Sequence, residues 1–141
     1  MKVITNKPIP EQFENSFNQL IKNDDALFIV VGDLNLKGRY AESMMVFTKN
    51  RIIAFDECYD NGSFSIDYCD IEDSQVKRLY GNAVFKIKMK NGKKKMLLRF
   101  SYAAAEVADA AAVFVNALND GKDLTDELET VKSVYHKQRC F

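Results

Sequence analysis

The residue types that most often carry catalysis are sparse in this chain and do not assemble into a catalytic set. The single histidine, His136, lies in the C-terminal tail, away from any strand that could hold it beside a serine or cysteine nucleophile. Asp56, Glu57 and Asp60 are close enough in sequence to hold a cation or to act as acid and base. The turn-rich residues around them, 58–62, favour a solvated turn instead. We therefore predict that the chain is not an enzyme and has no catalytic residue, cofactor or metal.

Charge and composition are typical of a cytoplasmic domain. Twenty basic and twenty acidic residues cancel, so the molecule has no net field to attract nucleic acid or a membrane. The longest apolar run, residues 26–31, is far shorter than the roughly 20 residues that span a bilayer. Cys58, Cys69 and Cys140 have no metal-binding spacing and indicate free thiols. We predict a cytoplasmic protein, with peripheral contact to the inner face of a membrane as an alternative.

One dense basic patch falls in a predicted hairpin between residues 83 and 100. Apolar and lysine residues alternate, and Asn91-Gly92 is typical of a two-residue turn. That turn would place Ile87 opposite Met96, and like charges opposite each other indicate an acidic residue nearby. The patch comprises Lys86, Lys88, Lys90, Lys93, Lys94 and Lys95.

Two explanations of these lysines remain open. Lysines on a sheet edge prevent pairing with another chain, and they also attract anionic lipid by about 1 kcal/mol each near the surface. Nucleic acid is not expected, because no exposed aromatic residues are interleaved with the lysines for base stacking.

The hydrophobic periodicity predicts the elements that position these residues. Alternation indicates seven short strands, at about 27–31, 40–48, 51–56, 63–68, 75–80, 85–90 and 93–100. A change to helical spacing after Ser101 indicates a helix over 101–119 that the Ser101 hydroxyl caps and a left-handed Gly121 ends. An amphipathic helix is predicted over 10–22, and Thr125 is expected to cap a further helix.

Two neighbouring strands, residues 44–47 and 52–55, are apolar on both faces. Such a sheet needs a cover on its outer face, either the N-terminal helix or a second copy of the chain. The predicted interaction face, or its alternates on the other side, consists of Met45, Phe47, Ile52 and Ala54.

Three stretches resemble those of GRAM domains and bacterial PH-like domains. Residues 46–56 (Val-Phe-Thr-Lys-Asn-Arg-Ile-Ile-Ala-Phe-Asp) resemble their apolar-Thr-Arg hairpin, and residues 65–71 resemble their strand followed by Asp-Ile. Residues 85–101 resemble their closing hairpin. The resemblance, over about 25–119, implies a mainly β (α+β) fold: a seven-stranded antiparallel PH-like barrel capped by a C-terminal helix, with an N-terminal amphipathic helix.

The resemblance also suggests a division of the chain. Residues 1–24 form an N-terminal extension with its helix, 25–121 the PH-like domain, and 122–141 a helical tail or linker. Bacterial PH-like domains include modules placed ahead of larger partners, among them ABC-transporter polypeptides, and the tail after Gly121 is consistent with a chain cut from a longer protein.

Lipid-binding PH domains hold inositol phosphates with basic residues around the first hairpin loop. Here Lys37 and Arg39 flank Gly38 in that region, but their spacing departs from the lipid-binding pattern and Asp33 and Glu42 lie close by. We therefore predict a non-catalytic interaction module that binds another protein, another domain or a second copy. The alternative is binding of the basic hairpin to anionic membrane lipid, with Lys37 and Arg39 contributing.

Overall fold

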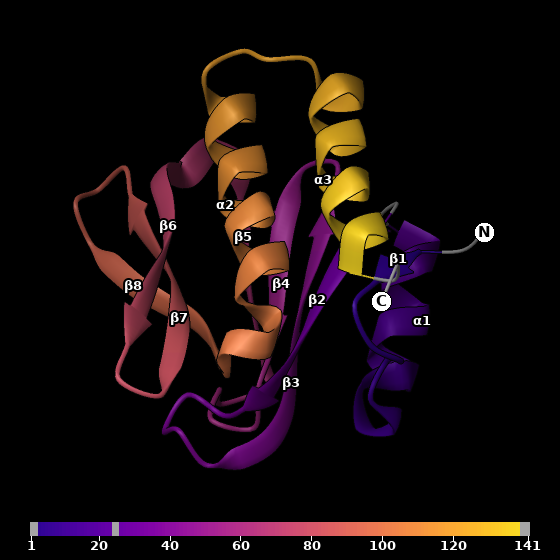
Figure 1. Ribbon diagram of the computed structural model, residues 1–141, viewed down its shortest axis with the longest axis vertical. Helices are drawn as coiled ribbons and strands as arrows, with labels where there is room; N and C mark the ends of the chain where they lie inside the picture. Colours follow the sequence, from indigo (N-terminus) through magenta and orange to yellow (C-terminus); the bar gives the residue numbers. More distant parts are fainter. Residues whose placement is uncertain (1–2, 24–25, 139–141) are drawn as a thin grey trace.

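The structure is a computed structural model that describes residues 3–23 and 26–138. Within these ranges the elements follow one another through short loops (Figure 1). The strands are β1 (Ile4–Thr5), β2 (Ala26–Leu34), β3 (Tyr40–Thr48), β4 (Arg51–Phe55), β5 (Ser63–Asp67), β6 (Ile71–Leu79), β7 (Asn82–Met89) and β8 (Lys94–Phe100). The helices are α1 (Glu14–Asn23), α2 (Ala105–Asn119) and α3 (Leu124–Gln138).

The strands form one sheet in the order β5-β4-β3-β2-β8-β7-β6, antiparallel throughout, and the short β1 pairs in parallel with β2. The register between β2 and β8 contains only Leu34 opposite Arg99, so a narrow junction divides the sheet into halves β2–β5 and β6–β8. The seven predicted strands correspond to β2–β8, although β6 begins at Ile71, earlier than predicted. Because β5 and β6 are the two ends, the sheet is open between them and hydrogen bonds do not close the predicted barrel.

The main core, the inner cluster, lies between the two halves of the sheet and α2. Phe28 stacks on Phe47 with ring centroids 4.6 Å apart, and Phe114 of α2 meets Phe28 edge-on at 5.1 Å. Alanines along α2 allow this close approach, since Ala108 and Ala111 are fully buried. The predicted helix stripe is therefore confirmed in its buried positions.

The predicted interaction face belongs to this inner cluster. None of its four side chains is exposed: Met45, Phe47, Ile52 and Ala54. The sequence gives the correct alternation but not which face looks inward, because both faces are equally apolar. These residues stabilise the fold from inside, so the prediction of a docking surface at these positions is wrong.

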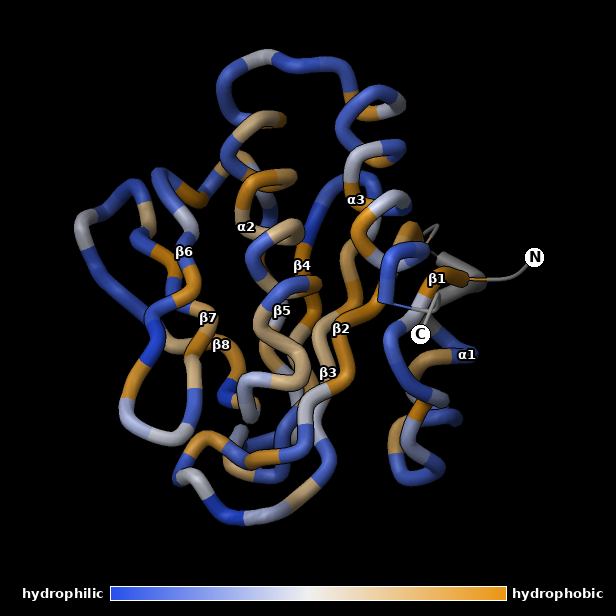
Figure 2. The backbone as a smooth tube through the Cα atoms, in the orientation of Figure 1, coloured by the Kyte–Doolittle hydropathy of each residue, from blue (hydrophilic) through white to orange (hydrophobic). Residues whose placement is uncertain are grey.

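The alternate residues of the same strands form an outer cluster under α1. Phe13 and Phe17 pack on this face, and the rings of Phe13 and Phe55 lie 5.5 Å apart. The remaining members are Ile29, Val31, Met44, Val46 and Ile53. Figure 2 shows hydrophobic residues concentrated along β2, β3 and β4, with α1 beside them. The predicted cover by the N-terminal helix is thus confirmed.

The β7–β8 hairpin has a longer turn than predicted. The Met89 N–H donates to the Lys93 carbonyl at 2.7 Å, and Gly92 has a φ of +89°. The turn therefore has three central residues with glycine in the left-handed position, a geometry that adds a bulge. The longer turn makes Ile87 face Lys95 instead of Met96, whereas Phe85 still lies opposite Leu98, because a second irregularity between Phe85 and Lys86 restores the predicted register.

The ends of α2 are fixed in two different ways. Gly121 has the predicted left-handed conformation, and the Lys122 N–H returns to the Ala117 carbonyl at 3.0 Å. At the other end Ser101 does precede the helical turn, but its hydroxyl makes no capping bond. Instead the Ser101 hydroxyl donates to Asp33 Oδ2 at 2.6 Å, so the predicted cap is wrong and the serine joins the helix start to β2.

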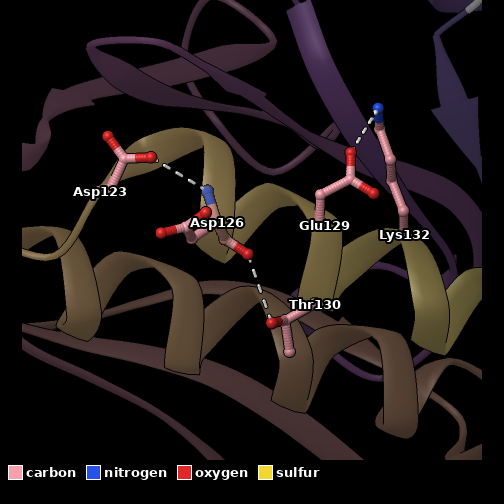
Figure 3. Close-up of polar contacts among 5 residues, drawn as sticks. All are labelled: Asp123, Asp126, Glu129, Thr130 and Lys132. Atoms are coloured by element: carbon pink, nitrogen blue, oxygen red, sulfur yellow. Dashed lines mark hydrogen bonds and ion pairs between the residues drawn. The ribbon is translucent and has the colours of Figure 1, made fainter.

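The C-terminal helix α3 packs against the domain. Val131 and Tyr135 are buried, and the Tyr135 hydroxyl donates to the Ile29 carbonyl at 2.6 Å. Its cap is Asp123, whose Oδ2 accepts from the Asp126 N–H at 3.3 Å (Figure 3). Thr125, the predicted cap, lies inside the first turn.

Side chains of α2 cover part of the β6 edge. The Asn116 amide bonds both backbone groups of Ser74: its Oδ1 accepts from the Ser74 N–H at 2.9 Å and its Nδ2 donates to the Ser74 carbonyl at 2.8 Å. Asn119 donates to the Ile71 carbonyl, and Arg78 pairs with Asp109 farther along the helix. A helix face thus takes the position of a neighbouring strand.

Replacing Asn116 by alanine is predicted to lower the free energy of unfolding by about 2–4 kcal/mol, because Ser74 is buried and both its backbone groups lose their partner. Urea unfolding measures the change. Asn119→Ala is the control and is expected to cost less than about 1 kcal/mol, since Asn119 is exposed and makes one such bond. Equal effects of the two substitutions would contradict the strand-like role of Asn116.

Phe17→Ala is predicted to destabilise the protein by about 3 kcal/mol, since a large buried ring is lost from the outer cluster. Removal of residues 1–24 is expected to cause association, visible by size-exclusion chromatography with light scattering, because the outer cluster loses its cover. The control for Phe17→Ala is Asn18→Ala, which replaces the exposed neighbouring side chain and should change the stability little. A truncated protein that stays soluble and monomeric would show that this face needs no cover.

Candidate functional site

The structure gathers three of the predicted lysines on the outer face of β7 and β8. Lys86 and Lys88 alternate with the buried Phe85 and Ile87, and Lys94 lies directly opposite Lys88. We call Lys86, Lys88 and Lys94 the lysine face. It borders an open hollow of about 580 Å³ that continues onto β6. Three ammonium groups on one twisted surface can attract phosphate or carboxylate groups without enclosing them.

Acidic residues of β6 relieve the repulsion on this face. Asp73 lies opposite Lys88 in the sheet, and the Lys88 ammonium is 3.3 Å from a Glu72 carboxylate oxygen. The sequence-based prediction of an acidic neighbour is therefore confirmed. Both side chains are about half exposed, so the pair is worth no more than about 1 kcal/mol.

Lys95 does not belong to the lysine face. Its ammonium lies 4.4 Å from the ring centroid of Phe64 and 5.2 Å from that of Tyr59, toward β5. The longer turn shifts Lys95 opposite the inward-facing Ile87, which turns its side chain away from Lys94. Lys90 and Lys93 are exposed beside the turn itself. Sequence alternation alone cannot reveal this separation, because a one-residue shift changes the face of every side chain.

Lys37 and Arg39 lie at the other end of the β6–β8 half. Their backbone N–H groups both donate to Asn35 Oδ1, at 2.9 and 3.1 Å, and their side chains are exposed. Arg99 fixes this loop by donating from Nε to the Leu36 carbonyl at 3.0 Å. Since β8 rises about 3.4 Å per residue, Arg99 is roughly 17 Å from Lys94. The structure therefore does not bring the loop and the hairpin tip together (Figure 1).

The acidic loop after β4 is held in place by hydrogen bonds to two of its carboxylates. Asp56 is fully buried and its Oδ1 accepts from the Cys58 N–H at 2.8 Å, whereas Glu57 accepts from the Asn35 amide at 2.8 Å. Asp60 is exposed. The interpretation of a solvated turn is thus wrong for Asp56, which supports the turn from inside.

Three tyrosines, Tyr68 and Tyr135 buried and Tyr59 partly buried, also have structural roles. Their hydroxyls donate to backbone carbonyls: Tyr59 to Leu97 at 2.8 Å, Tyr68 to Thr48 at 2.6 Å, and Tyr135 to Ile29. Burial raises the pKa of each phenol, and the Asp56 carboxylate adds to this effect at Tyr59. These hydroxyls stay protonated and hold loop, sheet and helix together.

The edge strand β5 carries a second surface that the sequence analysis did not identify. The Gly62 carbonyl accepts from the Asp56 N–H, and the Tyr68 N–H donates to the Asn50 carbonyl. Because antiparallel pairing alternates, Phe64 and Ile66 also direct their backbone groups toward β4. The N–H and carbonyl groups of the intervening residues point outward and have no partner among the described residues: Ser63, Ser65 and Asp67.

A groove of about 660 Å³ runs beside this β5 edge. It is lined by residues 64–67 of β5 together with Asp70, Met89, Lys90 and Asn91. Asp67 and Asp70 lie at its end, where their carboxylate oxygens and the Cys69 sulfur are within 4.8 Å of one another, all three side chains being exposed. Free strand edges of this kind accept an added strand.

No protein-family model matches the chain, and no curated protein matches it either. In the part of the chain that the structure describes, none of the helices is both long and apolar enough to cross a bilayer. The two surfaces described above are therefore the basis on which function is argued.

Ser101→Ala is predicted to raise the pKa of Asp33. Burial alone would raise this pKa, but the hydrogen bonds from Ser101, together with the Asp33 backbone N–H and the charge of Lys7, outweigh it and hold the pKa below its usual value. Because the folded-state pKa is lowered, the stabilisation is present above about pH 4 and is lost as the pH falls through the folded pKa. NMR titration of the Asp33 carboxyl carbon measures the shift.

Ser101→Thr, which keeps the hydroxyl, serves as the control and should leave the Asp33 pKa low. The alanine variant should also lose about 1 kcal/mol of stability at pH 7 and much less near pH 2. An unchanged Asp33 pKa in Ser101→Ala would contradict the link between Asp33 and the start of α2.

Proposed function

We propose that this chain is a non-catalytic interaction module of the PH-like type, which docks another protein or another domain. The strand order supports this architecture: two antiparallel meanders, β2–β5 and β6–β8, join where β2 pairs with β8, and the helix after the last strand packs on β6 at one open end of the sheet. The inner cluster fills the space between the two halves as the core of a PH-like barrel would.

The polar groups support binding in place of catalysis. Buried or partly buried Asp33, Tyr59 and Tyr68 are each bonded within the fold, mostly to backbone groups. Because these groups are already hydrogen-bonded within the fold, they hold the loops in place. They are poor candidates for proton transfer, which requires contact with a substrate.

The observation that carries the proposal is the β5 edge. Three consecutive outward backbone positions lack partners, and the strand has none of the lysines, prolines or bulges that usually protect an edge. An edge left open beside a groove is the feature expected of a module that receives a partner.

Site-specific photocrosslinking in the living source cell tests the docking function. A photoreactive phenylalanine analogue at position 65, on the β5 edge, is expected to give discrete adducts of higher mass. The same analogue at position 122, exposed in the loop between α2 and α3, is the control. Equal or absent adducts at both positions would contradict docking at this edge.

A second candidate function is peripheral binding to an anionic membrane through the lysine face. It is supported by the gathering of Lys86, Lys88 and Lys94 on one outer surface, with Lys90 and Lys93 at the adjoining turn. The neutral net charge does not oppose it, because only a local patch has to approach the lipid.

Replacing Lys86, Lys88 and Lys94 together by glutamine is predicted to weaken binding to phosphatidylserine vesicles roughly 100-fold at low salt, at about 1 kcal/mol for each lysine. Cosedimentation measures the effect, and 1 M salt should abolish wild-type binding. The control replaces Lys122, Lys132 and Lys137, which lie on or next to α3. Absence of wild-type binding at low ionic strength would exclude this function.

A further inference from the structure

The open β5 edge and its groove have a chemistry that specifies what can bind there. The inference rests on the proposed docking function and deepens it, because it names the partner of the same site. We propose that the β5 edge binds one extended peptide segment of a partner protein, in which apolar residues alternate with polar ones and a basic residue lies at the Asp67–Asp70 end.

The backbone geometry sets the extended conformation. Ser63, Ser65 and Asp67 present one N–H and one carbonyl each, at every second residue along a strand of five residues. Only a segment in β conformation repeats its own donors and acceptors with the same spacing. A helix satisfies its backbone groups internally and would leave the edge unpaired.

The side chains beside the edge set the alternation. On the inner side the added segment would meet Phe64 and Ile66, with Met89 across the groove, so alternate residues facing that side are apolar. On the outer side it would meet the small exposed serines of β5, which accept polar side chains. The resulting pattern has a period of two.

Charge sets the direction of the pattern along the groove. The groove is lined by the Asp67 and Asp70 carboxylates, which approach each other within 4.8 Å, and by the Lys90 ammonium, while Arg51 lies opposite Asp67 on β4. At the Phe64 end the Lys95 ammonium lies over the aromatic rings and repels a cation. A basic side chain of the partner therefore fits beside Asp67 and Asp70 and not at the opposite end.

The same charges argue against a second copy of this chain as the occupant. The antiparallel register that pairs all three free positions places Ser65 opposite Ser65 of the copy and Asp67 opposite Ser63. Within the paired strand the copy therefore offers no basic residue to Asp67.

The other edge of the sheet is partly covered by α2. Asn116 occupies the backbone groups of Ser74, and Asn119 bonds the Ile71 carbonyl, so α2 blocks β6 at these two positions. The three outward positions of β5 have no such cover among the described residues.

The test is selection of random octapeptides, displayed on phage, against the full chain and against Ser65→Pro. Proline removes the outward N–H of Ser65 without breaking a bond to β4, so the fold is expected to persist. Peptides enriched on the wild type alone should alternate apolar and polar residues and carry arginine or lysine near one end. A resynthesised peptide should bind at least tenfold more weakly to Ser65→Pro and equally well to Ser65→Ala.

Two further measurements do not depend on the fold of the proline variant. N-methylation of the peptide at the residues that face β5 should abolish binding to the wild-type chain, since it removes the donors of the added strand. Asp67→Asn combined with Asp70→Asn should weaken binding of the basic peptide several-fold and leave a peptide with glutamine in place of the basic residue unaffected.

Three outcomes would overturn the inference: no peptides enriched over Ser65→Pro, equal binding of the N-methylated peptide, or a dimer of the chain that light scattering detects in wild type but not in Ser65→Pro. If adducts form at position 65 in the cell but the peptide selection fails, docking at the β5 edge would still be supported. Only the proposed sequence pattern of the bound peptide would be refuted. Failure of both would refute docking at β5 itself.

Discussion

An open antiparallel sheet has two edges, here β5 and β6. They differ because the Asn116 amide of α2 bonds the backbone of Ser74 on β6. A primary amide carries a donor and an acceptor in the arrangement of a peptide group, so one side chain of α2 takes the place of one residue of a neighbouring strand. Because Ser74 is buried, leaving those backbone groups unpaired would cost several kcal/mol. This contact fixes α2 along β6 and so determines where the helix lies across the inner cluster.

The position of α2 leaves the surfaces of the protein with different roles. The inner face of the sheet is filled by the aromatic core, and the outer face of the β2–β5 half is covered by α1. The outer face of the β6–β8 half stays open and carries the lysine face, while the β5 edge stays unpaired. The two surfaces proposed for binding, the lysine face and the β5 edge, are therefore parts of the sheet that none of the described helices covers.

The sequence predicted the strands and helices well because their signals are local. The alternation around Phe85 and the helical stripe from Val107 to Phe114 depend only on which residues must be buried. Some predictions that needed long-range contacts were wrong. Ser101 has the right residue type for a cap, but Asp33, 68 positions away, takes its hydroxyl.

The candidate surfaces were harder to predict for a related reason. A turn longer by one residue was enough to separate Lys95 from the other lysines. Equal hydrophobicity of both faces concealed that Met45 and Phe47 point into the core. The β5 edge has no sequence signal at all, since an open edge is defined by the absence of a neighbouring strand, and only the arrangement of the whole sheet reveals it.

Amide hydrogen exchange at Ser65 and Ser74, followed by NMR on the isolated chain, tests this account most directly. Both N–H groups point away from their neighbouring strands, and only that of Ser74 has a partner, the Asn116 side chain. The account predicts that the Ser74 amide exchanges orders of magnitude more slowly than in an unfolded chain, whereas the Ser65 amide exchanges at a rate close to that of an unfolded chain. Equal protection of the two amides, or a protected Ser65 beside an unprotected Ser74, would contradict it.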